Sequence, residues 1–401
     1  MIIDNRCKGR HNYNMVNLKK ISLQKNQTNK LAQFRIFLLM LIFLLSELLN
    51  KTGFDDQIYS FNLSFILKLC FVLYSLFLLI KNRNTPFFYG FMALVGFLFF
   101  EILLLRDYIN LTFFTYSIRY CYFIFFLVFC QKHNQLSLKV FLKLFDFFIL
   151  INSIFILTGL LFDIGLFQTY RWKRFGYDGI FNMPSDNNYS YVLYAIVNCF
   201  YLKHKDEVFK YIALFNILIS LLTGTKTVII VSLIALIYIG IKLLKKKIIP
   251  AGILILSLIL VFRHKIAEVL EPTKQIFARL YNENGLLSSL TSTRYDNLKN
   301  TIADFYNNYS ISNILFYSKD FINIRVEMEL FDLFFFWGFL GLIIYLYTFF
   351  IIHRTVIFNK KNFYILSILL LTSFFAGKFL TNFTALFLLY IFLTLKDFNK
   401  S

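Results

Sequence analysis

The residues best suited to chemistry are cations in two polar stretches of an otherwise apolar chain. In the first stretch Arg171, Lys173 and Arg174 alternate with aromatic residues, and the second stretch contains Ser292-Thr293-Arg294. An arginine guanidinium can bind two oxygens of a phosphate or carboxylate at once. Both stretches therefore predict contact with an anion. For the first stretch the competing interpretation is an aromatic and basic anchor at a membrane interface.

Arg294 is predicted to stand at the start of a helix. Thr293 and Asp296 have the spacing of a capping box, and three apolar residues would share one face of the helix that follows: Leu298, Ile302 and Phe305. The unpaired N–H groups of a helix N-terminus attract anions, so Arg294 would add its charge to a favourable position. The alternative is an exposed arginine with no ligand.

Three further cations stand where apolar runs begin, end or break. Lys226 follows the short turn Gly224-Thr225, Arg119 lies within an apolar run, and Lys378 separates two such runs. Charges at membrane depth are costly and are associated with partners or water-filled cavities. The alternatives are lysines that extend to the interface and, for Arg119, a structural ion pair with Glu101.

Candidate proton acceptors are the carboxylates of Asp178, Glu327 and Glu329. Asp178 follows the first basic stretch, and the two glutamates precede a long apolar run. A positioned carboxylate can accept a proton from an attacking hydroxyl. Because Glu327 and Glu329 are two residues apart, they would diverge in a helix, one towards a cavity and the other towards solvent.

Signatures of soluble enzymes are absent from the sequence. It contains no GxSxG, Walker A or HExxH pattern, its five cysteines lack metal-ligand spacing, and its five histidines are scattered. We therefore expect no metal and no cofactor.

Composition indicates what positions these residues. Hydrophobic residues make up 58% and charged residues 16% of the 401, against about 45–50% and about 25% in soluble domains. A single soluble domain and a disordered chain are both excluded. Twelve apolar runs predict transmembrane helices: 31–49, 58–80, 86–105, 111–130, 140–162, 188–202, 208–223, 227–243, 248–263, 329–352, 363–377 and 379–395.

The net charge of +20 is explained by the orientation of the chain in the membrane, which places basic residues in cytoplasmic segments. If both termini are cytoplasmic, more than half of the 42 lysines and arginines fall on that side, as the positive-inside rule requires. Membrane lipid rather than nucleic acid is then the expected surroundings.

The predicted fold is an all-α polytopic membrane protein of about twelve transmembrane helices, with a large external loop that carries short helices. Its predicted divisions are a basic cytoplasmic tail (1–30), nine helices with an external loop at 163–187 (31–263), a large external loop (264–328), and three helices with a short cytoplasmic C-terminus (329–401).

Four segments, taken in order, resemble the O-antigen polymerase and ligase superfamily. They are Arg174 to Asn187 with Gly179, Phe181 and Pro184, then Gly224-Thr225-Lys226-Thr227, then Ser292-Thr293-Arg294, and finally Glu327 to Asp332 followed by Trp337-Gly338-Phe339-Leu340-Gly341. The last segment is similar to the polymerase branch. Near the C-terminus this chain has Gly377-Lys378 where a Gly-His pair is common in the family. The resemblance covers roughly residues 160–390.

The resemblance implies a metal-independent glycosyltransferase of the bacterial cytoplasmic (inner) membrane. It would join polyprenyl-diphosphate-linked oligosaccharide repeat units into a surface polysaccharide (O-antigen, capsule or exopolysaccharide) at the outer face. Six cations are expected to bind the diphosphate or substrate: Arg119, Arg171, Arg174, Lys226, Arg294 and Lys378. Glu327, Glu329 and Asp178 are the candidates for acceptor activation. A flippase and a chain-length regulator are candidate protein partners.

Two other functions fit the same features. A ligase would transfer finished polymer to another acceptor, and the acidic segment with the missing Gly-His pair favours a polymerase over it. A flippase or transporter of lipid-linked oligosaccharide would also need many spans and buried cations. However, transporters place their charges near the membrane midplane, and the 65-residue loop at 264–328 favours an enzyme.

Overall fold

The computed structural model describes residues 33–52, 63–104, 111–169, 175–243, 271, 274–275, 277–289, 291–307, 310–316, 325–354 and 360–397. Within these ranges the regular structure is helical and contains no strand. An isolated antiparallel bridge joins Gln168 and Tyr177. The predicted all-α class is therefore confirmed.

The N-terminal half contributes a helix at Gln33–Thr52, then α2 (Leu63–Lys81), α3 (Pro86–Leu104), α4 (Leu111–Tyr120), α5 (Tyr122–His133), α6 (Leu138–Phe162), η2 (Gly165–Phe167), α7 (Pro184–Tyr201), η3 (Leu202–His204), α8 (Glu207–Ser220), η4 (Leu221–Thr223) and α9 (Lys226–Leu243). The C-terminal half contributes helical residues 277–289, then α11 (Arg294–Asn307), α12 (Ile311–Leu315), α14 (Glu329–Arg354), α15 (Lys360–Ala376) and α16 (Phe383–Leu393).

Five described helices are long and apolar enough to cross a membrane: Gln33–Thr52, α2, α3, α6 and α14. The pair α4 and α5, bent by 44° between Tyr120 and Tyr122, would make a sixth. The described part of the chain therefore has five or six helices able to span a membrane. Each apolar run predicted above overlaps a described helix, or in the case of 111–130 the two helices α4 and α5. The exception is 248–263, which lies outside the described residues. Predicted crossings beyond these five or six are not established by helix length and hydropathy.

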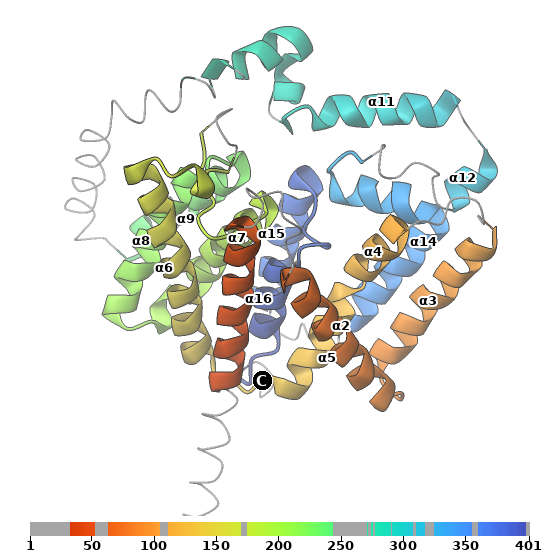
Figure 1. The fold of residues 1–401 in the computed structure, drawn as a ribbon, viewed down its shortest axis with the longest axis horizontal. Helices are drawn as coiled ribbons and strands as arrows, with labels where there is room; N and C mark the ends of the chain where they lie inside the picture. Colours follow the sequence, from red (N-terminus) through yellow and green to blue (C-terminus); the bar gives the residue numbers. More distant parts are fainter. Residues whose placement is uncertain are drawn as a thin grey trace, which may run out of the picture.

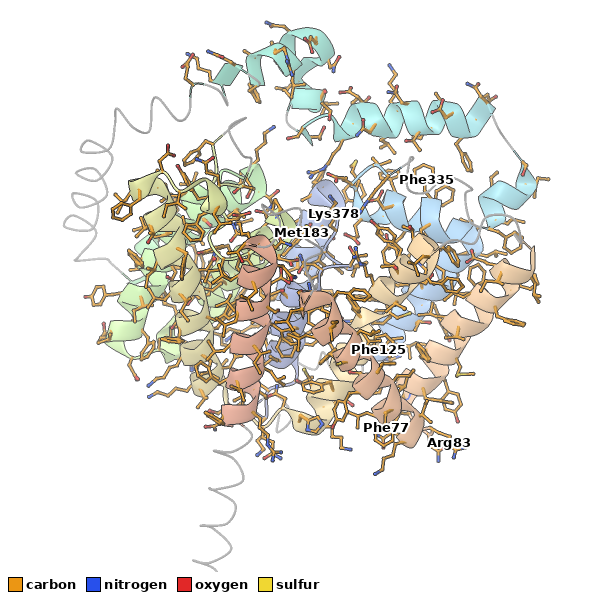
Figure 2. All side chains as sticks on the ribbon, in the orientation of Figure 1. Phe77, Arg83, Phe125, Met183, Phe335 and Lys378 are labelled. Carbon is orange, nitrogen blue, oxygen red and sulfur yellow. The ribbon has the colours of Figure 1, made fainter. Side chains whose placement is uncertain are left out.

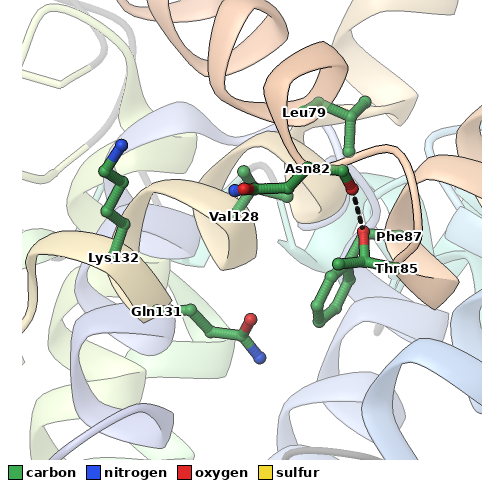
Figure 3. Close-up of a pocket in the computed structure, with 7 residues that line it drawn as sticks. All are labelled: Leu79, Asn82, Thr85, Phe87, Val128, Gln131 and Lys132. Atoms are coloured by element: carbon green, nitrogen blue, oxygen red, sulfur yellow. Dashed lines mark hydrogen bonds between the residues drawn. The ribbon is translucent and has the colours of Figure 1, made fainter.

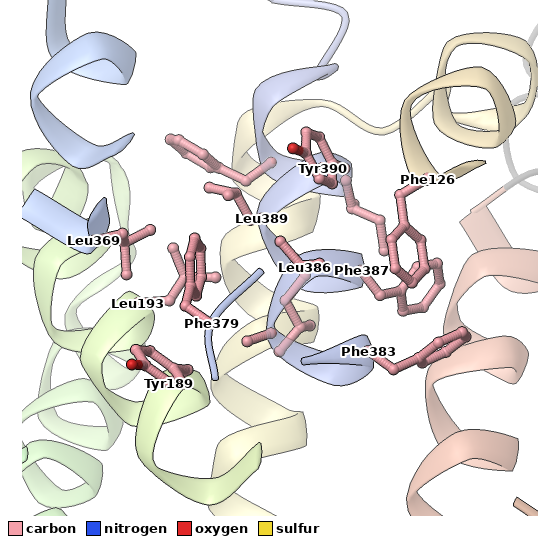
Figure 4. Packing of buried hydrophobic residues seen from close by; sticks show 14 of the residues in the cluster. Phe126, Tyr189, Leu193, Leu369, Phe379, Phe383, Leu386, Phe387, Leu389 and Tyr390 are labelled. Carbon is pink, nitrogen blue, oxygen red and sulfur yellow. The ribbon is translucent and has the colours of Figure 1, made fainter. Parts of the chain in front are cut away.

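The helices pack around α7 and α16. α7 contacts α9, α15 and α16, while α16 also contacts α5. Every residue of α16 is buried, which agrees with its uniformly apolar sequence. Figure 4 shows aromatic side chains filling this centre, and the ring of Phe126 lies with its centroid 4.8 Å from that of Phe383 and 5.6 Å from that of Phe387.

Glycines explain two close approaches along α14. Gly338 interrupts the helix with φ of 65°, and an added Cβ there would lie 2.3 Å from the carbonyl oxygen of Phe316. A Cβ on Gly341 would lie 2.5 Å from the Phe97 ring of α3. Because these two glycines have no side chain, Phe316, which follows α12, can approach α14 closely at Gly338, and helix α3 can approach it at Gly341.

The molecule has two distinct ends. α11 and α12 lie across one end of the bundle, here called the α11 end, and the C-terminus lies at the other (Figure 1). Helix α11 confirms the predicted helix at Arg294. Two details of that prediction are wrong. The Thr293 hydroxyl donates to the Ser292 carbonyl instead of capping the helix, and Ile302 is 50% exposed, whereas Leu298 and Phe305 pack on the core.

Candidate functional site

Four charged residues meet at the α11 end and are called here the Glu327 cluster: Arg294, Arg325, Glu327 and Lys378. One carboxylate oxygen of Glu327 lies 3.4 Å from Nη2 of Arg294, and the other forms an ion pair with Nζ of Lys378. Nη1 of Arg294 also donates to the carbonyl oxygen of Phe375, at 3.3 Å. Figure 2 places Lys378 on the side of the bundle that faces α11.

The backbone of the cluster is held in uncommon conformations. Glu327 has φ of 63° and Lys378 has φ of 65°, values that residues other than glycine seldom adopt. Gly377 has φ of 62°, and a Cβ there would lie 2.2 Å from the carbonyl oxygen of Glu327. Ser292 and Thr293 also have positive φ. Such strain persists where surrounding structure enforces it, and it gathers at functional sites.

Arg325 was not among the residues predicted to bind substrate. Its Nη1 donates to the Tyr116 hydroxyl at 2.6 Å, and its Nε lies 3.9 Å from Oδ2 of Asp332. The tyrosine ring also lies beneath the guanidinium, at 5.1 Å. The sequence signal that could have identified Arg325 is its position directly before the acidic segment, at the end of the predicted external loop.

Two guanidinium donors in the cluster have no hydrogen-bond acceptor. Nε of Arg294 and Nε of Arg325 are both buried, and neither donates to an atom of the described chain. Because an unsatisfied buried donor costs about 1–3 kcal/mol, such groups call for an explanation. Nε of Arg325 lies 3.9 Å from Oδ2 of Asp332, too far for a hydrogen bond. Two guanidinium groups with unused N–H donors beside Lys378 suit an anion with several oxygens.

Glu329 and Asp332 are held by backbone amides. Glu329 accepts hydrogen bonds from the N–H of Phe379 at 2.6 Å and of Leu380 at 3.2 Å. Asp332 accepts from the N–H of Val326 at 2.9 Å and of Glu327 at 3.2 Å. Both side chains are buried. Glu327 and Glu329 lie in different surroundings, but not as two positions of one helix as predicted, because α14 begins at Glu329. The geometry favours a structural role for Glu329, whose carboxylate fixes the turn after Lys378.

Glu327 remains accessible and charged. Its side chain is 36% exposed. Partial burial raises the pKa of Glu327, but the hydrogen bond and charge of Lys378, and the charges of Arg294 and Arg325, outweigh burial and hold the pKa below its usual range. An ionised, accessible carboxylate between two cations is thus the most exposed acid of the site.

Lys226 lies next to the cluster. It opens α9, and its Nζ donates to the carbonyl oxygen of Ser289 and, at 3.1 Å, to Oγ of Ser292. Because Ser292 is two residues before Arg294, Lys226 connects the start of α9 to the segment that carries Arg294. The predicted turn before Lys226 is present, with φ of 71° at Gly224.

The first predicted loop reaches the same end of the molecule. Arg171 and Arg174 lie outside the described residues, but Phe175 and Gly176 pack against Gly224, where an added Cβ would lie 2.1 Å from the Phe175 carbonyl oxygen. The N–H of Tyr177 donates to the carbonyl oxygen of Leu222 at 3.0 Å. The loop is therefore joined to the turn before Lys226.

Asp178 is separate from the Glu327 cluster. It is 2% exposed and forms an ion pair with Lys51, whose Nζ also donates to the carbonyl oxygens of Gly179 at 2.9 Å and Phe181 at 3.0 Å. These residues are called here the Lys51 lock. The geometry favours a structural role for Asp178, because its carboxylate fastens the loop to helix Gln33–Thr52.

Arg119 belongs to a third group, inside the bundle. Its guanidinium lies 5.3 Å from the centroid of the Tyr116 ring. Nearby, Lys68 pairs with Glu47 at 2.8 Å. Among the described residues, Tyr116 connects Arg119 to the cluster, because its ring lies against the Arg119 guanidinium and its hydroxyl accepts a hydrogen bond from Arg325.

A pocket of about 340 Å³ lies between the α2–α3 turn and the end of α5 (Figure 3). Asn82, Thr85, Gln131 and Lys132 are among its lining residues. None of the predicted site residues lines it, so it does not belong to the candidate site.

The structure thus brings together Lys226, Arg294, Glu327 and Lys378, places Glu329 directly behind them, and adds Arg325. It sets Asp178 and Arg119 apart. Comparison with known proteins gives no neighbour for this arrangement: no family model matches the chain, and searches of curated proteins and of solved structures find no match.

Proposed function

We propose that the chain is a metal-independent glycosyltransferase that joins polyprenyl-diphosphate-linked oligosaccharide repeat units into a surface polysaccharide. The reaction would take place at the α11 end, on the outer face of a bacterial cytoplasmic membrane. In that topology the chain crosses the membrane about twelve times and both termini are cytoplasmic.

The observation that carries the proposal is that charged residues from separate segments of the sequence meet at one site. Four segments of the chain, between residues 226 and 378, supply Lys226, Arg294, Glu327 and Lys378. Contacts of side chain and backbone connect these residues at one end of the bundle. The segments of Lys226, Arg294 and Glu327 are three of those that resemble polymerases of lipid-linked glycans, and Lys378 stands where that family commonly has a histidine. A structural role alone gives no reason for these particular segments to meet.

The chemistry of the cluster fits a diphosphate leaving group. As the glycosidic carbon separates from the diphosphate oxygen, negative charge develops on the phosphate. Arg294, Arg325 and Lys378 would stabilise that charge, and preorganised donors of this kind contribute strongly to catalysis. The Nε groups of Arg294 and Arg325 form no hydrogen bond within the described part of the chain, so these two guanidinium groups have donors left for the phosphate oxygens.

The acceptor hydroxyl needs a group that takes its proton. Glu327 is the accessible carboxylate of the cluster, while Glu329 and Asp178 are buried and already paired. Glu327 is therefore the base in this proposal. No bound metal is required, since the three cations carry the charge of the leaving group.

Deletion of the gene in its host tests the proposal. If the chain is the polymerase, surface glycan analysed on a gel is reduced to single repeat units. Long lipid-linked polymer that is never transferred would identify a ligase, and repeat units trapped on the inner leaflet would identify a flippase. Either of these results would overturn the proposal.

Complementation sharpens the test. Arg294→Ala should fail to restore long polymer, whereas Arg279→Ala should restore it. Arg279 serves as a matched control because it stands in the same large loop, is 67% exposed and pairs only loosely with Glu283 at 4.0 Å.

A further inference from the structure

The Glu327 carboxylate occupies the position that a phosphate would take. Both its oxygens are engaged by cations, one by Arg294 and the other by Lys378. A carboxylate and a phosphate oxygen make the same kind of charge-assisted hydrogen bond with these donors. An incoming diphosphate would therefore meet an internal anion already bound, and the two negative charges would repel each other.

Among the three acids near the site, only Glu327 is free to leave. Glu329 and Asp332 are buried and are fixed by two backbone amides each. The Glu327 side chain is held only by the side chains of Arg294 and Lys378 among the described residues, and it is 36% exposed. Its own backbone is anchored, because its N–H donates to Asp332 at 3.2 Å. The carboxylate can thus swing away while the chain stays in place.

We propose that the substrate diphosphate displaces the Glu327 carboxylate from Arg294 and Lys378, and that this release prepares Glu327 to act as the base. This inference rests on the proposed function. Once separated from the two cations, the carboxylate holds a proton more readily, so it becomes a better acceptor only after the donor substrate has bound. The empty site would keep its base inactive.

The reaction then balances as follows. The displaced Glu327 carboxylate accepts the proton of the acceptor hydroxyl as that oxygen forms a bond to the glycosidic carbon. The bond between this carbon and the diphosphate oxygen breaks, and its electron pair leaves with the diphosphate, which Arg294 and Lys378 hold. When the diphosphate departs, Glu327 gives its proton to water and pairs again with the two cations.

Calorimetric titration of the purified full-length chain with inorganic pyrophosphate tests the displacement. Because the wild-type protein must first break the internal contact, Glu327→Gln should bind pyrophosphate about tenfold or more tightly. The same variant should form polymer far more slowly. Glu283→Gln is the matched control, since Glu283 is an exposed acid in the same loop, and it should leave both properties unchanged.

The outcomes separate this inference from the proposed function. Equal or weaker binding by Glu327→Gln, with binding lost in Arg294→Ala, would overturn the displacement and leave the proposed function standing. No pyrophosphate binding by the wild-type chain or by Glu327→Gln would overturn both.

A second measurement uses the wild-type chain, and so does not depend on whether the variant folds. A carbodiimide and an amine label accessible carboxylates, and mass spectrometry identifies the labelled residue. Pyrophosphate should increase labelling of Glu327, because the displaced carboxylate is no longer paired. Unchanged or reduced labelling in the presence of bound pyrophosphate would overturn the displacement.

Discussion

The Lys51 lock and the Glu327 cluster both pair lysine with a carboxylate near the start or end of a helix, yet they differ in every other respect. In the lock, Lys51 and Asp178 are almost fully buried, and Lys51 Nζ donates to three oxygens. In the cluster, Glu327 and Lys378 are each about one-third exposed and have positive φ, and two neighbouring guanidinium donors are unmet.

Burial and the completeness of hydrogen bonding distinguish a structural ion pair from a functional one more clearly than the presence of charge does. A buried pair whose hydrogen bonds are complete holds the chain in place and has nothing left to offer a ligand. A strained, accessible pair with spare donors is poorly explained by stability and is suited to binding. Asp178 and Glu327 both carry a carboxylate, and their different surroundings indicate different roles.

The largest effect is expected from breaking the lock. Lys51→Met would leave the Asp178 carboxylate buried without its cation, and losing one partner of a buried pair costs about 3–5 kcal/mol. We expect that loss in the free energy of unfolding, measured in detergent with denaturant. Adding Asp178→Leu should recover much of the stability. If the single variant unfolds like wild type, the lock is not structural.

Breaking the cluster should instead reduce activity at constant stability. Arg294→Ala removes a donor to the leaving group, and loss of one such donor lowers rates by about 10²–10³. The rate of polymer formation should fall by that factor, while the unfolding midpoint stays near wild type because Arg294 is partly exposed. A fall in stability without a change in specific activity would reverse the assignment.

The backbone of the cluster offers a smaller test. Gly377→Ala places a Cβ against the Glu327 carbonyl at φ of 62°, and strain of this kind costs about 1–3 kcal/mol. Polymer formation and the unfolding free energy should both fall. Gly96→Ala in α3 is the matched control, since an added Cβ there meets nothing within 4 Å. Equal behaviour of the two variants would show that the Gly377 turn is not constrained.

The smallest effect is acid sensitivity. The pKa of Glu327 is lowered in the folded protein, so its pairing stabilises the fold at pH values above the ordinary carboxyl pKa of about 4.3. That contribution disappears as pH falls from there through the lower folded value. Because the group is partly exposed, we expect less than about 1 kcal/mol. We expect wild type to have a larger free energy of unfolding than Glu327→Gln at neutral pH. Measured between pH 3 and 7, this difference should shrink as pH falls below about 4.3.

Much of the helical framework follows from the sequence. Long apolar runs such as 58–80 and 140–162 can be predicted as helices, because a helix that faces lipid or core on most sides needs few polar residues. Bends and interruptions of a helix within an apolar run are harder to predict from the sequence. The bend between Tyr120 and Tyr122 contains no proline or glycine, and the interruption of α14 at Gly338 depends on the approach of Phe316, which is a contact distant in sequence.

The site was predicted in part. Arg294, Lys226, Lys378 and Glu327 could be selected because each charge interrupts an apolar or loop pattern. Arg325 is missed although it stands directly before the acidic segment, because the contact that distinguishes it from other loop arginines is with Tyr116, 209 residues earlier. Asp178 was overvalued for the opposite reason: its partner Lys51 lies 127 residues away, at the end of a run that gives no sign of the contact.

The most direct test of the account is turnover by the purified chain. The protein is placed in lipid nanodiscs and supplied only with a polyprenyl-diphosphate-linked repeat unit, and products are followed over time on a gel. The account predicts a ladder of lengthening glycans, with one polyprenyl diphosphate released for each bond formed, and no ladder with Arg294→Ala. Binding of the repeat unit without any lengthening by the wild-type chain would contradict it.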